Sequence, residues 1–195
     1  PDIQFAVKKL ATDMCKPTNR NWQELKRLGR YLKGRPRLVI NYNWQEPTLN
    51  ITATSDSDWA GDKISRKSTS GGIAFRGLHC IKSWSSNRII IALSSAEAEL
   101  YGMVEGVTRA KGLRTLAWEL GFRSLENSIK LGTDSSAAKS FVSRRGLGKM
   151  RHLEIRDLWL QAEVEQGRLV VHKVKGDQNP ADLMTKHLVR DKVDK

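Results

Sequence analysis

The stretch SDSDWAGD, residues 55–62, places two aspartates at the end of a segment with the pattern of a strand. The segment NITATSD, residues 50–56, alternates with a period of two, which is typical of a strand with one buried face. Asp56 and Asp58 can each stabilise the turn into Gly61. Asp56 still belongs to the strand and therefore has a fixed direction, which makes it the better candidate for a ligand.

The chain is strongly basic, which favours a polyanionic partner. Its 195 residues contain 34 Lys and Arg against 21 Asp and Glu, a formal net charge of +13. A surplus of this size is typical of proteins that bind nucleic acid, with a basic protein that has no such partner as the alternative. The positive residues are spread along the whole chain, so the fold has to assemble any binding surface.

The apolar runs argue against a membrane protein, and the cysteines argue against a metal site built on them. No run approaches the roughly 20 apolar residues of a membrane span, so we expect no membrane partner. Cys15 and Cys80 lack the spacing of metal ligands, which favours a reducing compartment. The chain starts with Pro-Asp-Ile and shows no signal peptide, and we interpret it as a piece of a longer polypeptide.

The first part of the chain has a helical pattern. Two helices are expected within residues 1–36, separated by a break at 17–19, and a short strand is predicted at 38–42. The best candidate for a linker is the segment 43–47. We therefore divide the chain into a helical appendage and a second domain, residues 1–46 and 47–195.

The second domain has the element pattern of an α/β fold. Its first three strands follow one another closely and can form an antiparallel meander, whereas strands separated by helices tend to run parallel to their predecessors. This order predicts a five-stranded mixed sheet flanked by helices. The expected strands are 50–56, 71–77, 80–85, 129–134 and 168–174, and the expected helices are 94–120, one from 135, 152–165 and 179–188.

Four acidic residues lie at or near the ends of these elements. The first and fourth strands can lie side by side, which would bring Asp56 and Asp134 to one edge of the sheet. Carboxylates crowded in this way repel one another unless a cation lies among them, and ligation by oxygen alone suits Mg²⁺ or Mn²⁺. The candidate metal ligands are Asp56, Glu99, Asp134 and Asp182.

Helix capping offers a structural interpretation for some of these carboxylates. Asp134 can cap the helix beside it, and Asp182 has a position that is common at helix starts, so both interpretations stay open at this point. In SSAE, residues 94–97, the glutamate can complete a capping box with the first serine. Glu99 has no such task, which favours it as the functional glutamate.

Several separated motifs occur in an order that resembles a known family. They are SDSDWAGD (55–62), RKSTSGG (66–72), SWSS (83–86), ALSSAEAE (92–99) and NPADLMTK (179–186). Together they resemble the ribonuclease H domain of the Pol polyprotein of copia-type LTR retrotransposons. The first 34 residues are similar to the last part of the preceding reverse transcriptase, its thumb or connection, so the resemblance covers nearly the whole chain.

This resemblance implies a ribonuclease H fold with four acidic ligands for two divalent ions. The first-strand aspartate of the family matches Asp56, and the glutamate of its Ala-Glu-Leu motif matches Glu99. The aspartate of Thr-Asp-Ser matches Asp134, and the last aspartate matches Asp182. The resemblance thus implies that Asp56 binds metal and that Asp58 shapes the turn.

A loop histidine of related enzymes has no match at its usual place. Cellular and retroviral relatives usually have a histidine after a Lys-Gly or Pro-Gly pair before the last helix, but here Lys175-Gly176 is followed by Asp177. His152 and His172 are the nearest candidates, and a structural role is the preferred interpretation for each. Which group replaces that histidine stays open.

The implied activity is hydrolysis of the RNA strand of RNA–DNA hybrids by a two-metal-ion mechanism during reverse transcription. The minor groove of a hybrid exposes the 2′-hydroxyls that mark the strand to be cut, while basic side chains hold phosphates. The reverse transcriptase polymerase region of the same polyprotein is the second expected partner. For each candidate contact a solvated or structural role is the alternative; the candidates are Arg66, Lys67, Asn87, Arg88, Ser135, Arg145, Lys149 and Arg151.

Two other functions have to be weighed. A catalytically inactive ribonuclease H-fold connection module would only bind nucleic acid, but such a copy usually loses ligands and all four are present here. An integrase-like transferase would end its motif on a glutamate rather than on Asp182. The family implies action in cytoplasmic virus-like particles, with a nuclear phase left open.

Overall fold

The computed structural model describes residues 1–148 and 158–188, and within them five strands form one mixed sheet with the order β3-β2-β1-β4-β5. β1 pairs antiparallel with β2 and parallel with β4. β3 is antiparallel to β2, and β5 is parallel to β4. The prediction of a five-stranded mixed sheet is confirmed. The strands are β1 (Ile51–Asp58), β2 (Thr69–Arg76), β3 (His79–Asn87), β4 (Ile129–Thr133) and β5 (Leu169–Lys173).

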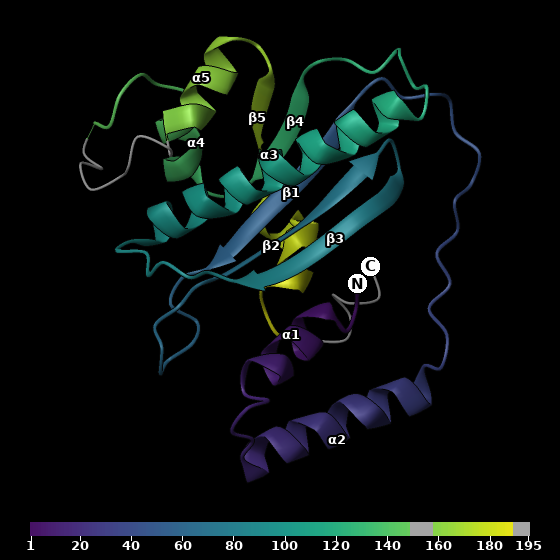
Figure 1. Cartoon of the computed structure of the whole chain (residues 1–195), viewed down its shortest axis with the longest axis vertical. Helices are drawn as coiled ribbons and strands as arrows, with labels where there is room; N and C mark the ends of the chain where they lie inside the picture. The colour runs from purple at the N-terminus through teal and green to yellow at the C-terminus, as the bar shows by residue number, and fades with distance from the viewer. Residues whose placement is uncertain (149–157, 189–195) are drawn as a thin grey trace.

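Helices cover both faces of this sheet. The long helix α3 (Ser95–Glu119) crosses one face, and the 3₁₀ helix η3 (Pro180–Met184) lies on the other (Figure 1). α4 (Ser136–Val142) and α5 (Trp159–Glu165) pack beside β5. The core lies between α3 and the sheet, where burial of apolar side chains supplies the main driving force. It includes Ile51, Ala53, Trp84, Leu100, Met103, Val107, Ile129, Leu131, Phe141, Leu160 and Leu169.

The N-terminal appendage consists of α1 (Gln4–Thr12) and α2 (Asn19–Gly34). α1 packs against β3 and η3, whereas α2 has no buried residue and lies at the bottom of Figure 1. The Lys8 ammonium donates hydrogen bonds to Thr69 Oγ1 at 2.7 Å and to Asn87 Oδ1 at 2.9 Å, which ties α1 to the sheet. The division after residue 46 stays a prediction.

Two of the predicted elements differ from the structure. The predicted strand at 38–42 is wrong: residues 35–50 contain neither helix nor strand, because this segment has no pairing partner and its apolar side chains are exposed. The predicted helix at 179–188 is the short 3₁₀ helix η3, preceded by η2 (Gly176–Gln178). The chain leaves η3 at Thr185, whose side chain turns to a carboxylate in β1.

Two further findings concern helices. The helix predicted at 152–165 is α5 from Trp159 onward, and its first part lies outside the described residues. Within the described residues, no helix combines the length and the apolar character needed to cross a membrane.

Candidate active site at the ends of β1 and β4

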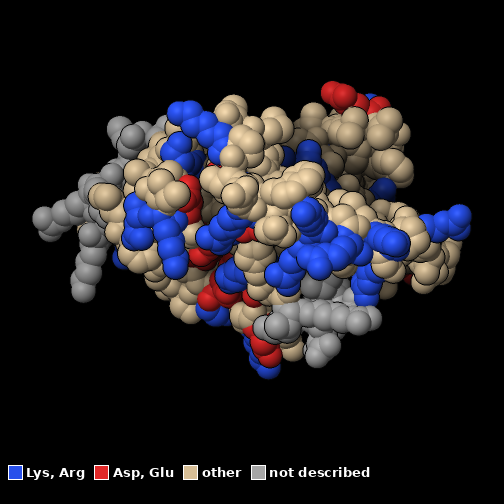
Figure 2. Space-filling model, turned by 90° about the horizontal axis from the view of Figure 1, so that it is seen from below, with Lys and Arg blue, Asp and Glu red and all other residues tan. Residues whose placement is uncertain are grey.

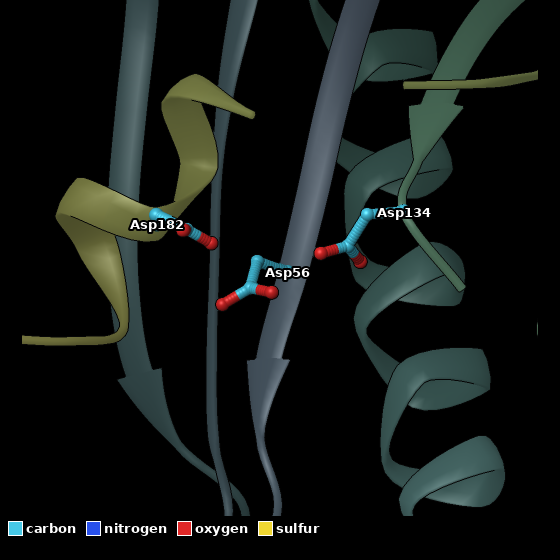
Figure 3. A group of neighbouring side chains, drawn as sticks. All are labelled: Asp56, Asp134 and Asp182. Carbon is cyan, nitrogen blue, oxygen red and sulfur yellow. The ribbon is translucent and has the colours of Figure 1, made fainter. Parts of the chain in front are cut away.

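Parallel pairing of β1 with β4 brings two aspartates to one edge of the sheet. Asp56 lies near the end of β1 and is 1% exposed, and Asp134 directly follows the last residue of β4. Because the carboxyl ends of parallel neighbours meet at the same edge, the two side chains point toward each other (Figure 3). The expected juxtaposition of these two strands is therefore confirmed.

Asp182 reaches the same place from the opposite side of β1. It lies in η3, which packs against β2 and β1. One carboxylate oxygen from each of Asp56, Asp134 and Asp182 can be chosen so that all three lie within 4.8 Å of one another (Figure 3). Carboxylates at this separation repel unless a positive charge lies among them.

Ser135 and Asn179 cap the helices for which Asp134 and Asp182 were possible caps. The Ser135 hydroxyl accepts a hydrogen bond from the Ala138 backbone N–H at 3.2 Å at the start of α4. The Asn179 side chain accepts from the Ala181 N–H at 3.1 Å and donates to the Ser55 carbonyl at 3.3 Å. Both aspartates are therefore left without a capping role.

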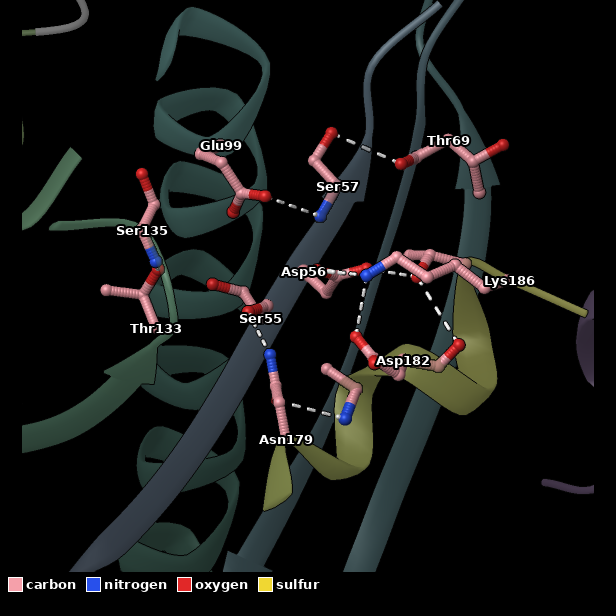
Figure 4. A network of polar contacts seen from close by, with 12 residues as sticks. Ser55, Asp56, Ser57, Thr69, Glu99, Thr133, Ser135, Asn179, Asp182 and Lys186 are labelled. Carbon is pink, nitrogen blue, oxygen red and sulfur yellow. Dashed lines mark hydrogen bonds and ion pairs between the residues drawn. The ribbon is translucent and has the colours of Figure 1, made fainter. Parts of the chain in front are cut away.

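Glu99 extends the cluster from α3. Its Oε1 accepts a hydrogen bond from the Ser57 backbone N–H at 3.3 Å, while its buried Oε2 has no hydrogen-bond partner (Figure 4). Burial, together with the negative charges of Asp56 and Asp134, raises the pKa of Glu99 from 4.5 to about 8. A buried oxygen without a partner costs free energy, so this atom is suited to a ligand that the protein itself does not supply.

The neighbouring acidic residues have structural contacts instead. The Glu97 carboxylate accepts from the Leu93 backbone N–H at 2.7 Å and from the Tyr101 hydroxyl at 2.7 Å. Its backbone N–H donates to the Ser94 hydroxyl at 3.2 Å, but its carboxylate binds the Leu93 N–H and not that of Ser94, so only half of the predicted capping box forms. The Asp58 carboxylate lies against Gly61, at the turn that follows β1.

Thr185 and Lys186 complete the surroundings of Asp56, and the sequence patterns did not single them out. The Thr185 hydroxyl donates to Asp56 Oδ2. The Lys186 ammonium lies 3.2 Å from Asp56 Oδ1 and 2.8 Å from Asp182 Oδ1 (Figure 4). Acid and lysine four residues apart are a familiar pair on helices, and that spacing was the available signal.

Burial and the polar contacts of Asp56 and Lys186 shift the pKa values of these two groups in opposite directions. Burial raises the pKa of Asp56, while the hydrogen bond from Thr185 and the charge of Lys186 oppose that rise. Burial would lower the pKa of Lys186, but the hydrogen bond to Asp182 and the charge of Asp56 outweigh it, so that this pKa is raised. The ammonium therefore stays charged at neutral pH.

The donor set fits a hard divalent cation. All four acidic side chains offer oxygen only, which is the ligand type of Mg²⁺ and Mn²⁺. The position of the Lys186 ammonium shows that a positive charge is accommodated between Asp56 and Asp182, and Glu99 Oε2 is a buried oxygen still without a partner. The residues that would hold such an ion are Asp56, Glu99, Asp134 and Asp182.

Several residues predicted to contact nucleic acid have partners within the chain. Asn87 bonds to Lys8 and, at 2.8 Å, to Thr12 of α1, and Ser135 caps α4. Arg88 pairs with Glu105 at 3.2 Å, and Arg145 pairs with Glu165. Their role toward nucleic acid stays a prediction, as it does for the exposed Arg66 and Lys67; Lys149 and Arg151 lie outside the described residues.

The histidine candidates lie apart from the aspartate cluster or outside the described part. His172 is in β5 and pairs in register with Gly132, and burial followed by the charges of Lys139 and Lys130 lowers its pKa. His152 lies outside the described residues. His187, next to Lys186, contacts the Phe5 ring edge-on at 4.9 Å between centroids.

Comparison with known proteins identifies relatives over nearly the whole chain. The retrovirus-related Pol polyprotein from transposon RE1 of Arabidopsis thaliana is 35% identical over 191 residues, 97% of this chain. The corresponding polyprotein from transposon RE2 of the same plant is 32% identical over 191 residues. The chain spans 13% of the length of each of these relatives. No profile of a known protein family matches the chain.

A solved structure shares the fold of this chain. The foamy viral protease-reverse transcriptase in complex with dsDNA superposes with a TM-score of 0.55 at 13% identity, covering 83% of this chain and 30% of that one. An N-terminal RNase H domain from Mycobacterium tuberculosis gives a TM-score of 0.46 at 16% identity, covering 75% of this chain and 95% of that one. From the sequence similarity and the five-stranded mixed sheet, the chain belongs to the retrovirus-related Pol polyproteins of copia-type transposons, as a segment with a ribonuclease H-like fold.

Proposed function

We propose that the chain is a ribonuclease H that hydrolyses the RNA strand of RNA–DNA hybrids, with Asp56, Glu99, Asp134 and Asp182 as ligands of two Mg²⁺ or Mn²⁺ ions. The observation that carries this proposal is the group of three aspartate oxygens within 4.8 Å of one another. Keeping these charges together in a partly buried site is unfavourable unless a cation offsets their repulsion. Membership of the Pol polyprotein family supports the reaction class.

Hydrogen bonds within the chain hold the proposed metal ligands in place. Divalent ions in such a site lower the pKa of bound water and stabilise charge on phosphate oxygens. The Ser57 N–H fixes one oxygen of Glu99 and leaves the other oxygen available. The Thr185 hydroxyl fixes Asp56, so that both carboxylates are held before any ion binds.

The charge of the chain supports a polyanionic substrate. Figure 2 shows Lys and Arg side chains distributed over the face seen from below. We propose that this surface contacts the hybrid backbone, that the polymerase region of the same polyprotein is a partner, and that the protein acts in cytoplasmic virus-like particles. Exposed basic residues of α2, the helix at the bottom of Figure 1, are Arg20, Lys26, Arg27, Arg30 and Lys33.

Cleavage of an RNA–DNA hybrid labelled on the RNA strand tests this function. In Mg²⁺ we expect cuts in the RNA strand of the hybrid, no cuts in the DNA strand or in duplex DNA, and no activity with EDTA. The inactive connection module predicts another result: the hybrid would be bound but left intact at every concentration of Mg²⁺ or Mn²⁺.

Glu99 makes the metal-free protein less stable as the pH rises. Its pKa of about 8 in the folded chain is above the ordinary 4.5, so the folded state favours the protonated form. This contribution is fully present below about pH 4.5 and is lost as the pH rises through about 8. Between pH 6 and pH 9 we expect the free energy of unfolding in EDTA to fall by about 2–3 kcal/mol.

Urea denaturation at several pH values measures this loss. Glu99→Gln removes the titrating group, so its free energy of unfolding should vary less with pH than that of the wild type. Equal pH profiles for the two proteins would show that the Glu99 carboxyl is not perturbed in this way.

A further inference from the structure

The Lys186 side chain is bound to two of the proposed metal ligands at once. Its ammonium lies 3.2 Å from Asp56 Oδ1 and 2.8 Å from Asp182 Oδ1 (Figure 4). Asp56 is 1% exposed, whereas the side chain of Lys186 is 41% exposed. The lysine thus reaches from the solvent side into the group of carboxylates and contacts a buried one.

The residue before Lys186 anchors it there. Thr185 is completely buried and donates its hydroxyl to Asp56 Oδ2, while its backbone N–H donates to the Asp182 carbonyl at 3.1 Å. Lys186 Nζ donates to the other oxygen of Asp56. Both oxygens of this carboxylate are therefore bonded to two consecutive residues of the same segment.

Other lysines near the site do not neutralise the cluster in this way. Lys173 also lies beside it, but its ammonium donates to the backbone carbonyl of Asp134 rather than to a carboxylate. Across residues 1–148 and 158–188, Lys186 alone forms ion pairs within the group of three clustered aspartates, and it pairs with two of them, Asp56 and Asp182. A divalent ion bound to Asp56 Oδ1 and Asp182 Oδ1 would lie close to this ammonium, and the repulsion between the two positive charges favours its displacement by the ion.

We propose that Lys186 is a built-in competitor of the metal: its ammonium occupies the carboxylate oxygens of Asp56 and Asp182 in the metal-free protein and leaves them when a divalent ion binds. Lys186 thereby holds the acidic cluster together without metal and sets the concentration of divalent ion that the site requires. The inference rests on the metal site of the proposed function, but not on cleavage of any substrate. Lys186 acts here as a positioning residue for Asp56 and Asp182.

Metal binding to Lys186→Met tests the proposal without any substrate. Methionine keeps a long unbranched side chain and removes the charge. Calorimetric titration with Mn²⁺ should give a first ion bound about tenfold more tightly than in the wild type, as estimated for a unit charge removed from beside a divalent ion in a medium close to water. Without metal, the variant should melt several degrees lower, and saturating Mn²⁺ should remove that difference.

Two control variants separate competition from general charge effects. Lys173→Met removes a neighbouring lysine that does not bind a carboxylate, and it should change the Mn²⁺ affinity by less than about threefold, given its greater separation from the ligands. Lys186→Arg keeps the charge and should bind Mn²⁺ with close to wild-type affinity. If Lys186→Met unfolds without metal, recovery of its native circular dichroism on addition of Mn²⁺ would support the proposal.

Equal or weaker binding of Mn²⁺ by Lys186→Met would overturn the proposal, as would its failure to refold at Mn²⁺ concentrations that saturate the wild type. The proposal would also be overturned if Lys173→Met changed the Mn²⁺ affinity as much as Lys186→Met does, since the effect would then not depend on the carboxylate contacts. If the wild type binds Mn²⁺ and the substitutions of Lys186 leave the affinity unchanged, only this inference is refuted. If neither protein binds Mn²⁺, the metal site of the proposed function fails as well.

Discussion

Asp134→Asn should strongly slow hydrolysis of an RNA–DNA hybrid while leaving binding of the hybrid intact. Asp134 is one of the three clustered aspartates, and asparagine has nearly the same shape but no negative charge. Loss of one charged ligand removes stabilisation that is needed in the transition state, and we expect the rate to fall on the order of 10³-fold. A single-turnover assay with saturating enzyme and labelled hybrid measures this rate.

The matched control for this substitution is Asp177→Asn. Asp177 lies exposed in η2, near the site in sequence but outside the group of clustered aspartates, so its rate should stay within about twofold of the wild type. Binding of the hybrid in EDTA should be unchanged or slightly tighter in both variants, because each becomes more basic. Retention of cleavage by Asp134→Asn would refute the assignment of Asp134 as a metal ligand.

Gly71→Ala should displace η3 and disrupt the site from a distance. Gly71 of β2 faces η3, and a Cβ at this position would lie 2.4 Å from Met184 Cβ and 2.8 Å from Thr185 Cγ2. Both neighbours are completely buried and cannot rotate away. We therefore expect the chain to lose about 1–3 kcal/mol of stability through overpacking, and Asp182 to move away from Asp56.

Urea denaturation and Mn²⁺ titration of the same samples measure these two effects. The matched control is Gly112→Ala in α3, where an added Cβ meets nothing within 4 Å. That substitution should stabilise the protein by about 0.5–1 kcal/mol, because alanine is the better helix former. Unchanged stability and unchanged Mn²⁺ affinity in Gly71→Ala would show that the close packing of η3 on β2 does not position Asp182.

Local patterns were sufficient to predict the elements that carry three of the four ligands. The helix predicted at 94–120 is α3, Ser95–Glu119, because a capping serine marks its start. The period-two segment 50–56 is β1, which continues for two residues to Asp58 because its pairing with β2 continues to Thr69. The strand predicted at 129–134 places Asp134 directly after β4.

Tertiary contacts decided what the patterns missed. The apolar segment 38–42 has strand character, but it lacks a neighbouring strand and stays irregular. Thr185 and Lys186 lie within a segment expected to be one helix, but η3 ends at Met184, packs against Gly71 of β2, and leaves both side chains bonded to Asp56. Asn87 bonds to Lys8 and Thr12 of α1, whose docking on β3 has no local signature, while its role at the nucleic acid stays a prediction.

The most direct measurement of the central claim is anomalous diffraction from crystals of the chain soaked in MnCl₂. The claim is that Asp56, Glu99, Asp134 and Asp182 form one site for divalent ions. It predicts anomalous peaks about 2 Å from carboxylate oxygens of this group, with Asp56 as a ligand and the Lys186 ammonium moved off it. Full occupancy of Mn²⁺ elsewhere on the chain, with no peak beside Asp56 and Asp134, would contradict the claim.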